Sequence, residues 1–396
     1  MYAPCLRKGR NKQMDLFIFS NIEKNETVRA VIDKDNTMLL RGIVRFAETE
    51  GVTDDSLREY IATLLANDEN VLSDIAKSGK SIGKDLYRLA SLDIEMIYKR
   101  LFNTKIKYKP SGNDTGFYEG YTGSIRGITE ASTAGELLDR LIMHYRKFGC
   151  GIMAKYIAFR FDDELVGVPN SDKTTFDDIV GMDHQKKVLI DNTKAFIDGK
   201  FSNNVLLFGD RGTGKSSSVK ALLNMYADEG LRVIELPKRA ITRIPELTKE
   251  LEKSPHKYIL FLDDLTFERH DTEYRSLKIA MEGQLQAAAK NVLVYATSNR
   301  RHLIRETWAD REGGEVHVND TKQEMLSLAE RFGISLYFPA PDAKQYIEIV
   351  RTLLARCGVE MTEDIRKEAV RWEMNYGGKS GRCAKQFVAD FMHKQS

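Results

Sequence analysis

A glycine-rich octapeptide, GDRGTGKS at residues 209–216, lies between the apolar run NVLLF and a helix-forming segment. Gly209, Gly212 and Gly214 permit tight turns with positive φ, so successive backbone N–H groups can face one anion. The helix that follows adds the positive end of its dipole at the same point. The G-x-x-x-x-G-K-[ST] pattern in this strand–turn–helix context therefore predicts a phosphate-binding loop.

The polar side chains of this loop predict which phosphate compound it binds. Lys215 can reach the β- and γ-phosphates of a nucleoside triphosphate, and the Ser216 hydroxyl is the expected magnesium ligand. ATP and Mg2+ are therefore the predicted cofactors. The other loop residues expected to contact the nucleotide are Gly209, Asp210, Arg211, Gly212, Thr213, Gly214 and Ser217.

Two adjacent carboxylates occur in the segment YILFLDDLTFE at residues 258–268. Its apolar start predicts a buried parallel strand, and ligands bind at the carboxyl ends of such strands. Asp263 is then expected to orient the magnesium ion, and Asp264 to lie on the γ-phosphate side as the base for the attacking water. Glu268 is the alternative base, but it can reach the site only if the LTF turn folds back.

Another apolar run, NVLVYATSNRRHL at residues 291–303, also ends in polar residues. In a parallel sheet its end would bring Thr297, Ser298 or Asn299 beside the γ-phosphate, where an amide could hold the attacking water. Ser and Asn also commonly begin turns, so this prediction depends on the run following the other two motifs in order.

Length and composition are those of a globular protein with more than one domain. The 396 residues exceed what one compact core usually holds. With 60 basic and 58 acidic residues, the formal charge of +2 gives no reason to expect a nucleic-acid-binding surface, although a local patch stays open. No apolar run approaches the roughly 18–20 residues that cross a bilayer, and a signal peptide is not expected. The four scattered cysteines predict reduced thiols in a cytoplasmic protein.

The pattern along the chain predicts four parts. Residues 1–103 read as a mostly helical N-terminal domain, because apolar residues recur there at helical spacing. Residues 104–170 read as a connector rich in glycine and tyrosine, irregular over 104–130 and a candidate ligand-binding loop, followed by a helix and a strand. Residues 171–341 alternate strands and helices, which predicts an α/β core with a mainly parallel sheet. Residues 342–396 read as a helical lid.

Six segments occur in the order found in AAA+ ATPases, and the chain resembles that superfamily. They are FDDIVGMDHQKKVLIDNTKAF, GDRGTGKS, FLDDL, YATSN, LAERFG and GGKSGRCAKQF. The resemblance implies a P-loop NTPase (AAA+) core with a C-terminal helical lid, ATP hydrolysis, and assembly into a homo-oligomer such as a ring.

The resemblance also implies roles for particular residues outside the loop. TFDDIVGMDHQK looks like the linker that packs on adenine, so Ile179, Val180 and Gly181 are expected to line the base. Asn299 resembles the sensor-1 residue, and Arg382 resembles the sensor-2 arginine that contacts the γ-phosphate from the lid.

A further implied role concerns the contact between subunits. Arg331, in LAERFG, resembles the arginine finger that is given to the nucleotide of a neighbouring subunit. Arg300, Arg301 and Arg305 are rivals for that role.

More closely, GDRGTGKSS, ILFLDDL and ATSNRRHLI resemble the uncharacterised bacterial AAA+ family named domain of unknown function 815, over roughly residues 110–396. Two features depart from ring-forming AAA+ proteins. The region ELPKRAITRIPELTKELEKS lacks the aromatic–apolar–Gly loop that grips a threaded chain. In addition, aspartate stands at Asp264 where glutamate is usual, and its shorter side chain predicts slow turnover.

Together these features predict a Mg-ATP-binding AAA+ ATPase that hydrolyses slowly and remodels or loads an unidentified protein partner through its N-terminal domain. The alternative is a nucleotide-gated interaction module with little or no hydrolysis. A small-molecule kinase would need an acceptor-binding acid or a basic lid near the loop, and none is convincing. A GTPase would need N-K-x-D after the loop, and that motif does not follow it.

Overall fold

The computed structural model describes residues 14–50, 56–106, 115–267, 272–282, 290–299, 330–376 and 378–395. Glu268, Arg300, Arg301 and Arg305 lie outside these ranges, as do residues 107–114 of the predicted connector. The chain divides into two compact units, Met1–Tyr156 with Lys253–His256, and Ile157–Glu252 with Lys257–Ser396.

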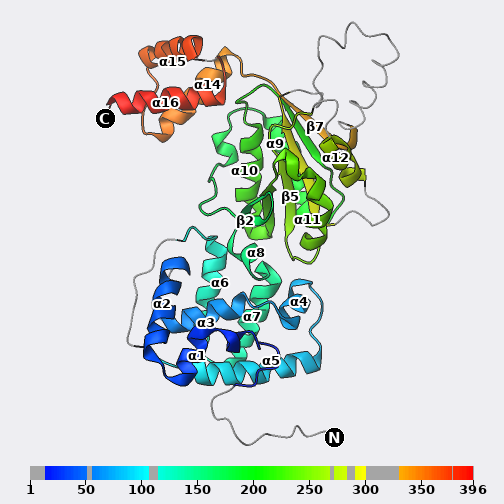
Figure 1. Ribbon diagram of the computed structural model, residues 1–396. Coiled ribbons are helices and arrows are strands. Elements are labelled where there is room, and N and C mark those ends of the chain that lie inside the picture. The colour runs from blue at the N-terminus through cyan, green and yellow to red at the C-terminus, as the bar shows by residue number, and fades with distance from the viewer. Residues whose placement is uncertain are drawn as a thin grey trace, which may run out of the picture. The chain divides into compact units, whose positions relative to one another are not determined.

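The first unit is helical throughout its described residues (Figure 1). Its elements are η1 (Ile22–Lys24), α1 (Glu26–Asp33), α2 (Asn36–Glu50), α3 (Ser56–Ala66), α4 (Val71–Lys77), α5 (Lys84–Ile97), the π-helical turn η2 (Tyr98–Phe102), α6 (Glu119–Thr129), α7 (Ala134–Phe148) and α8 (Ile152–Lys155). One apolar core joins them, and residues such as Ile43, Leu65 and Leu141 in it are fully buried. The predicted helical N-terminal region is therefore present.

Helix α6 contradicts the prediction of an irregular connector over residues 104–130. Glycine costs a helix about 1 kcal/mol relative to alanine, so the glycines of this segment argued against a helix. Tyr121, Ile125 and Ile128 are buried and lie on one helical face, and their contacts with the core offset that cost. Their spacing of four and three residues was the signal in the sequence.

The second unit contains a seven-stranded sheet in the order β2-β1-β4-β5-β6-β3-β7. The strands are β1 (Ala158–Phe161), β2 (Leu165–Gly167), β3 (Val205–Gly209), β4 (Leu231–Glu235), β5 (Lys257–Leu262), β6 (Val292–Ser298) and β7 (Ile334–Phe338). All neighbours pair in parallel except the edge pair β1–β2. The predicted parallel α/β core is confirmed, and its sheet begins earlier in the chain than the polar linker near residue 170 suggested.

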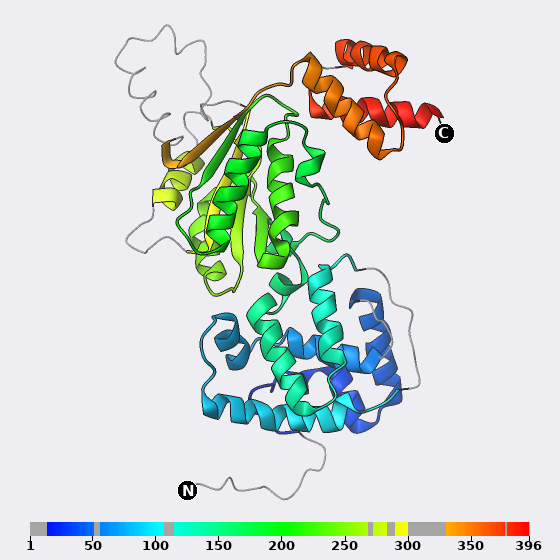
Figure 2. The same cartoon turned by 180° about the vertical axis from the view of Figure 1, so that it is seen from behind.

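Helices cover both faces of this sheet (Figures 1 and 2). Helices α9 (Asp183–Ile197) and α10 (Lys215–Tyr226) lie on one face, where their side chains form one core with alternate residues of the strands. Helices α11 (Ile244–Leu251) and α12 (Thr272–Glu282) lie on the other. The short turns η3 (Phe176–Asp178), η4 (Ala227–Glu229) and η5 (Lys238–Arg243) join these elements.

Three helices follow the last strand and form the lid. They are α14 (Ala343–Arg356), α15 (Glu363–Tyr376) and α16 (Gly381–Gln395), and they share a small apolar core of their own. Asp342 caps α14 by accepting a hydrogen bond from the Gln345 N–H at 2.8 Å. None of the helices in the described ranges is both long enough and apolar enough to cross a membrane.

Candidate functional site

The ends of three strands bring the sequence motifs together. Strand β6 pairs in parallel with β5 on one side and with β3 on the other. The phosphate-binding loop follows β3, the two aspartates follow β5, and Asn299 follows β6. Because parallel strands end at the same edge of a sheet, all three motifs lie at one edge.

The glycines of the loop are required by close backbone contacts. Gly209 has φ of 135°, and a Cβ there would lie 2.1 Å from the Phe338 carbonyl oxygen. Gly214 has φ of 96°, and a Cβ there would lie 3.1 Å from Cγ2 of Ile179. The loop is therefore packed between the end of β7 and the linker that precedes α9.

Lys215 lies in the centre of the loop and is 7% exposed. Its Nζ donates to the carbonyl oxygens of Gly209 at 2.9 Å and Asp210 at 2.6 Å. Burial lowers the pKa of Lys215 below its ordinary value, and the charges of Asp210, Asp263 and Asp264 oppose that shift.

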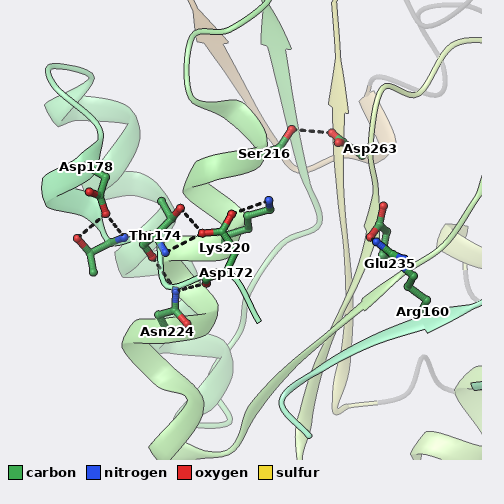
Figure 3. A network of polar contacts seen from close by, with 10 residues as sticks. Arg160, Asp172, Thr174, Asp178, Ser216, Lys220, Asn224, Glu235 and Asp263 are labelled. Atoms are coloured by element: carbon green, nitrogen blue, oxygen red, sulfur yellow. Dashed lines mark hydrogen bonds and ion pairs between the residues drawn. The ribbon is translucent and has the colours of Figure 1, made fainter. Parts of the chain in front are cut away.

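Asp263 accepts two hydroxyl hydrogen bonds on one carboxylate oxygen. Ser216 Oγ donates to its Oδ1 at 2.7 Å (Figure 3), and Thr297 Oγ1 donates to the same atom at 2.5 Å. The two residues predicted to hold magnesium, Ser216 and Asp263, are therefore in direct contact.

Asp264 adopts a left-handed backbone conformation with φ of 52°. Its N–H donates to Thr297 Oγ1 at 2.9 Å, and its Oδ1 accepts from Asn299 Nδ2 at 2.5 Å. Asn299 Oδ1 lies 3.5 Å from Lys215 Nζ, so Asn299 links the second carboxylate to the loop lysine. Of the three polar residues that end β6, Asn299 occupies the position expected of a water-holding amide, and Ser298 is buried.

A cavity of about 870 Å³ opens over these groups. Its walls include residues 211–217 of the loop, Asp263, Asp264 and Asn299, the linker residues 179–181, and Arg382 from the lid. Five cationic side chains and three carboxylates line it, a balance that suits a polyanion; they are Arg211, Lys215, Lys220, Arg382, Lys385, Asp178, Asp263 and Asp264.

Three predicted site residues do not line this cavity. Gly209 contributes the carbonyl oxygen that Lys215 contacts. Asp210 accepts a hydrogen bond from the Ala340 N–H on its Oδ2 at 3.0 Å, at the start of the lid. Arg331 is exposed at the end of a helical segment before β7 and is not among the described residues that line the cavity.

The linker before Ile179 is bound to α10 by a polar network (Figure 3). Asp172 accepts from Lys220 Nζ at 2.9 Å, and Asn224 Nδ2 donates to the carbonyl oxygens of Asp172 and Thr174. Hydrogen bonds from Thr174 first, and then from Lys220, lower the pKa of Asp172 to about 2. The apolar wall at Ile179 is thereby held beside the helix that begins at Lys215.

The lid contacts both the linker and the loop. Arg356 of α14 forms an ion pair with Asp178, and the Gly381 N–H at the start of α16 donates to the Gly212 carbonyl oxygen at 2.9 Å. Arg382 therefore begins the lid helix directly above the loop.

A family profile described as "Protein of unknown function (DUF815)" matches residues 154–395. The chain belongs to this family. No curated protein sequence matches it significantly. The predicted family and the predicted P-loop NTPase (AAA+) fold class are both confirmed.

Solved structures with a similar fold include AAA+ proteins. A RuvB variant of Thermotoga maritima has a TM-score of 0.38 and 17% identity, and the match covers 53% of this chain and 62% of that one. The RuvB Holliday junction branch migration motor of the same organism has a TM-score of 0.36 and 15% identity, with 55% and 71% covered. An E. coli HORMA:CdnC:Trip13 complex contains a chain with a TM-score of 0.35 and 15% identity, with 54% and 89% covered.

The residues that this DUF815 chain offers to a metal fit Mg2+. The ion prefers oxygen ligands and is usually held by one or two carboxylates together with substrate phosphates. Ser216 Oγ and Asp263 Oδ1 are 2.7 Å apart at the cavity wall, and no group of three or more His, Cys, Asp or Glu side chains in the described ranges forms an all-protein metal cage.

The sequence alone did not single out several residues of this site. Thr297 was considered for the γ-phosphate side, whereas its hydroxyl contacts the two aspartates. Lys220 and Lys385 also line the cavity. Lys385 follows Arg382 by three residues on α16, and that helical spacing was the available signal.

Proposed function

We propose that this DUF815 protein binds Mg-ATP in the cavity at the end of the sheet and hydrolyses it slowly, and that the change remodels or loads a protein partner. The observation that carries the proposal is the continuous set of contacts from Lys215 through Asn299 to Asp264, with Ser216 on Asp263 beside it. A purely structural acidic turn would not need a buried lysine, an amide and a hydroxyl at these positions.

The polyphosphate would lie along the loop N–H groups and Lys215, which spread the developing negative charge. Ser216 and Asp263 would hold Mg2+, which supplies further charge neutralisation on the phosphates when bound. Arg382 would approach the γ-phosphate from the lid. Each of these groups stabilises charge without moving far, because the strand ends and the loop contacts fix its backbone.

The base of the nucleotide would pack between the linker and the lid. Ile179 and Val180 form the linker wall of the cavity, and Ile349 and Leu353 form the lid wall. Apolar residues on two sides suit a flat purine ring, and the absence of N-K-x-D after the loop favours adenine over guanine.

The attacking water would lie between Asp264 and Asn299. Asn299 donates to Asp264 Oδ1, which leaves Oδ2 of the same carboxylate for the water. Aspartate has a shorter reach than the glutamate of ring-forming AAA+ proteins, and base geometry precedes pKa as a criterion. Slow turnover follows from that reach.

Steady-state phosphate release and ATP affinity test this proposal. Lys215→Ala should abolish ATP binding, because it removes the cation that meets the phosphates. Asp264→Asn should keep ATP binding and stop phosphate release. Lys367→Ala, a change at an exposed lid residue outside the cavity, is the matched control and should behave as the parent protein does.

The outcomes separate the proposed base from its alternatives. Asp264→Asn protein that hydrolyses as fast as the parent would show that the base is elsewhere, with Glu268→Gln next. A parent protein that binds Mg-ATP without measurable turnover would favour the nucleotide-gated interaction module, in which ATP only orders the lid. The short reach of Asp264 is the observation that keeps this second function open.

Assembly into a cytoplasmic homo-oligomer belongs to the same proposal. Arg331 is exposed and away from the cavity of its own chain, which suits a residue given to a neighbour. An arginine finger contributes roughly 10³–10⁵-fold in rate, so specific activity should rise with protein concentration. Size measurement with and without ATP, and Arg331→Ala, check this role.

The helical unit is the proposed partner-binding part, because the residues of the core are committed to nucleotide. Co-purification with an Asp264→Asn protein held in its ATP-bound form would identify the partner.

A further inference from the structure

We propose that Thr297 is a positioning residue whose single hydroxyl fixes both aspartates of the site. This inference rests on the proposed function and adds a residue that acts through Asp263 and Asp264 without touching the nucleotide. Thr297 is the penultimate residue of β6 and is 2% exposed, so its side chain is held in one place by the sheet.

The chemistry of a hydroxyl determines the direction of both hydrogen bonds. The backbone N–H of Asp264 can only donate, so Thr297 Oγ1 accepts from it at 2.9 Å. The hydroxyl proton is then directed to Asp263 Oδ1 at 2.5 Å, because an ionised carboxylate only accepts. One side chain therefore reads the backbone of one aspartate and the carboxylate of its neighbour.

The contact with Asp263 sets the orientation of the predicted metal-binding carboxylate. Ser216 Oγ donates to the same Oδ1 at 2.7 Å, so two hydroxyl donors from different elements fix that oxygen. Oδ2 then points away from both donors. Without the Thr297 hydroxyl, one of the two constraints on this carboxylate is lost, and its orientation toward Mg2+ is less well defined.

The contact with Asp264 holds an unfavourable backbone conformation. A non-glycine residue with φ of 52° is strained, and such residues persist when surrounding contacts fix them. Thr297 holds this turn on both sides, because its hydroxyl accepts from the Asp264 N–H and its carbonyl oxygen accepts from the Leu265 N–H at 2.7 Å. The left-handed turn places the Asp264 carboxylate against Asn299.

A structural role for a buried threonine in a strand is the competing explanation, and two variants separate it from positioning. Thr297→Val keeps the shape and the β-branched side chain but removes the hydroxyl. Thr297→Ser keeps the hydroxyl and loses a methyl group. Thr193→Val is the matched control, because Thr193 is also fully buried in this unit and its hydroxyl contacts only the Tyr295 hydroxyl at 2.8 Å among the hydrogen bonds found for it.

The experiment measures ATP affinity with Mg2+ and with chelator, Mn2+ binding to the ATP complex by electron paramagnetic resonance, and kcat. Thr297→Val should bind ATP in chelator as the parent does, but lose about tenfold of the affinity gained from Mg2+ and about 10–100-fold in kcat, the range expected for one or two hydrogen bonds to a charged group and a strained turn. Its Mn2+ affinity should fall in parallel. Thr297→Ser and Thr193→Val should stay within about threefold of the parent in all of these.

Each other outcome overturns a defined claim. Thr297→Val protein with parental Mg2+ dependence and kcat would overturn the positioning role while leaving the proposed function intact. Equal losses in Thr297→Ser would assign the effect to packing and also overturn it. If the parent binds Mg-ATP without turnover, the metal and affinity measurements decide alone. A parent that binds no nucleotide would overturn the proposed function and this role together.

Discussion

At the scale of single residues, the backbone of Asp264 is the unusual feature of this site. Its φ of 52° is a conformation that Asn and Asp tolerate better than residues with longer side chains. The sequence raised the question of whether aspartate could do the work of the usual glutamate. The structure answers part of it, because the left-handed turn, and not side-chain length alone, determines where the carboxylate lies.

We therefore predict that Asp264→Glu lowers phosphate release instead of raising it. A glutamate at this position would meet a conformational cost of roughly 1 kcal/mol. Its longer side chain would also displace Asn299 Nδ2, which is 2.5 Å from Asp264 Oδ1. Turnover at saturating Mg-ATP is the measurement, with ATP affinity as the control. An Asp264→Glu protein faster than the parent would show that side-chain length limits the rate.

At the scale of elements, some features could be predicted from local sequence and others could not. The loop, strands β3 to β7 and the lid helices were predictable, because each has its own periodic pattern or motif. Helix α6 was missed because its glycines outweighed the spacing of Tyr121, Ile125 and Ile128. The Thr297 contacts could not be foreseen, since they depend on the register in which Leu262 of β5 lies opposite Ala296 of β6.

Helix α7 carries a buried histidine that makes the helical unit sensitive to acid. His144 is 1% exposed, and burial lowers its pKa to about 3. Its Nδ1 lies 2.8 Å from Ser124 Oγ of α6, and its Nε2 is buried without a hydrogen-bond partner among the described residues. Protonation of the folded protein is therefore opposed, whereas the unfolded chain takes up a proton near pH 6.5.

We predict that acid destabilises this unit. Stability is unaffected above the unfolded pKa and falls as the pH drops below about 6.5, because the unfolded state then binds more protons. Between pH 7 and pH 5 the loss attributable to His144 is about 2 kcal/mol. Denaturation at several pH values measures it. His144→Gln should flatten the slope, and a change of the exposed His184 to Gln should not. An unchanged slope in His144→Gln would contradict the assignment.

At the scale of the whole molecule, the two units have separate apolar cores. The helical unit has one core, while the sheet and the lid have theirs. Units with independent cores can unfold independently, so two transitions are expected on heating.

We predict that Mg-ATP raises only one of these transitions. A ligand that binds the folded state at 100 times its Kd stabilises it by about 2.7 kcal/mol, and that gain belongs to the unit holding the cavity. Scanning calorimetry with and without Mg-ATP measures the shift, and Lys215→Ala should remove it. A shift of equal size in both transitions would mean that the units unfold together.

Strand β6 also fixes the dimensions of the site. It is the one strand between β3, which carries the loop, and β5, which carries the aspartates. Neighbouring strands are about 4.8 Å apart, so the loop and the carboxylates are separated by two such spacings, roughly 10 Å. Backbone hydrogen bonds set that width, and side-chain substitutions leave it unchanged. Mutation can therefore alter the chemistry of this site without resizing the gap that a triphosphate must fill.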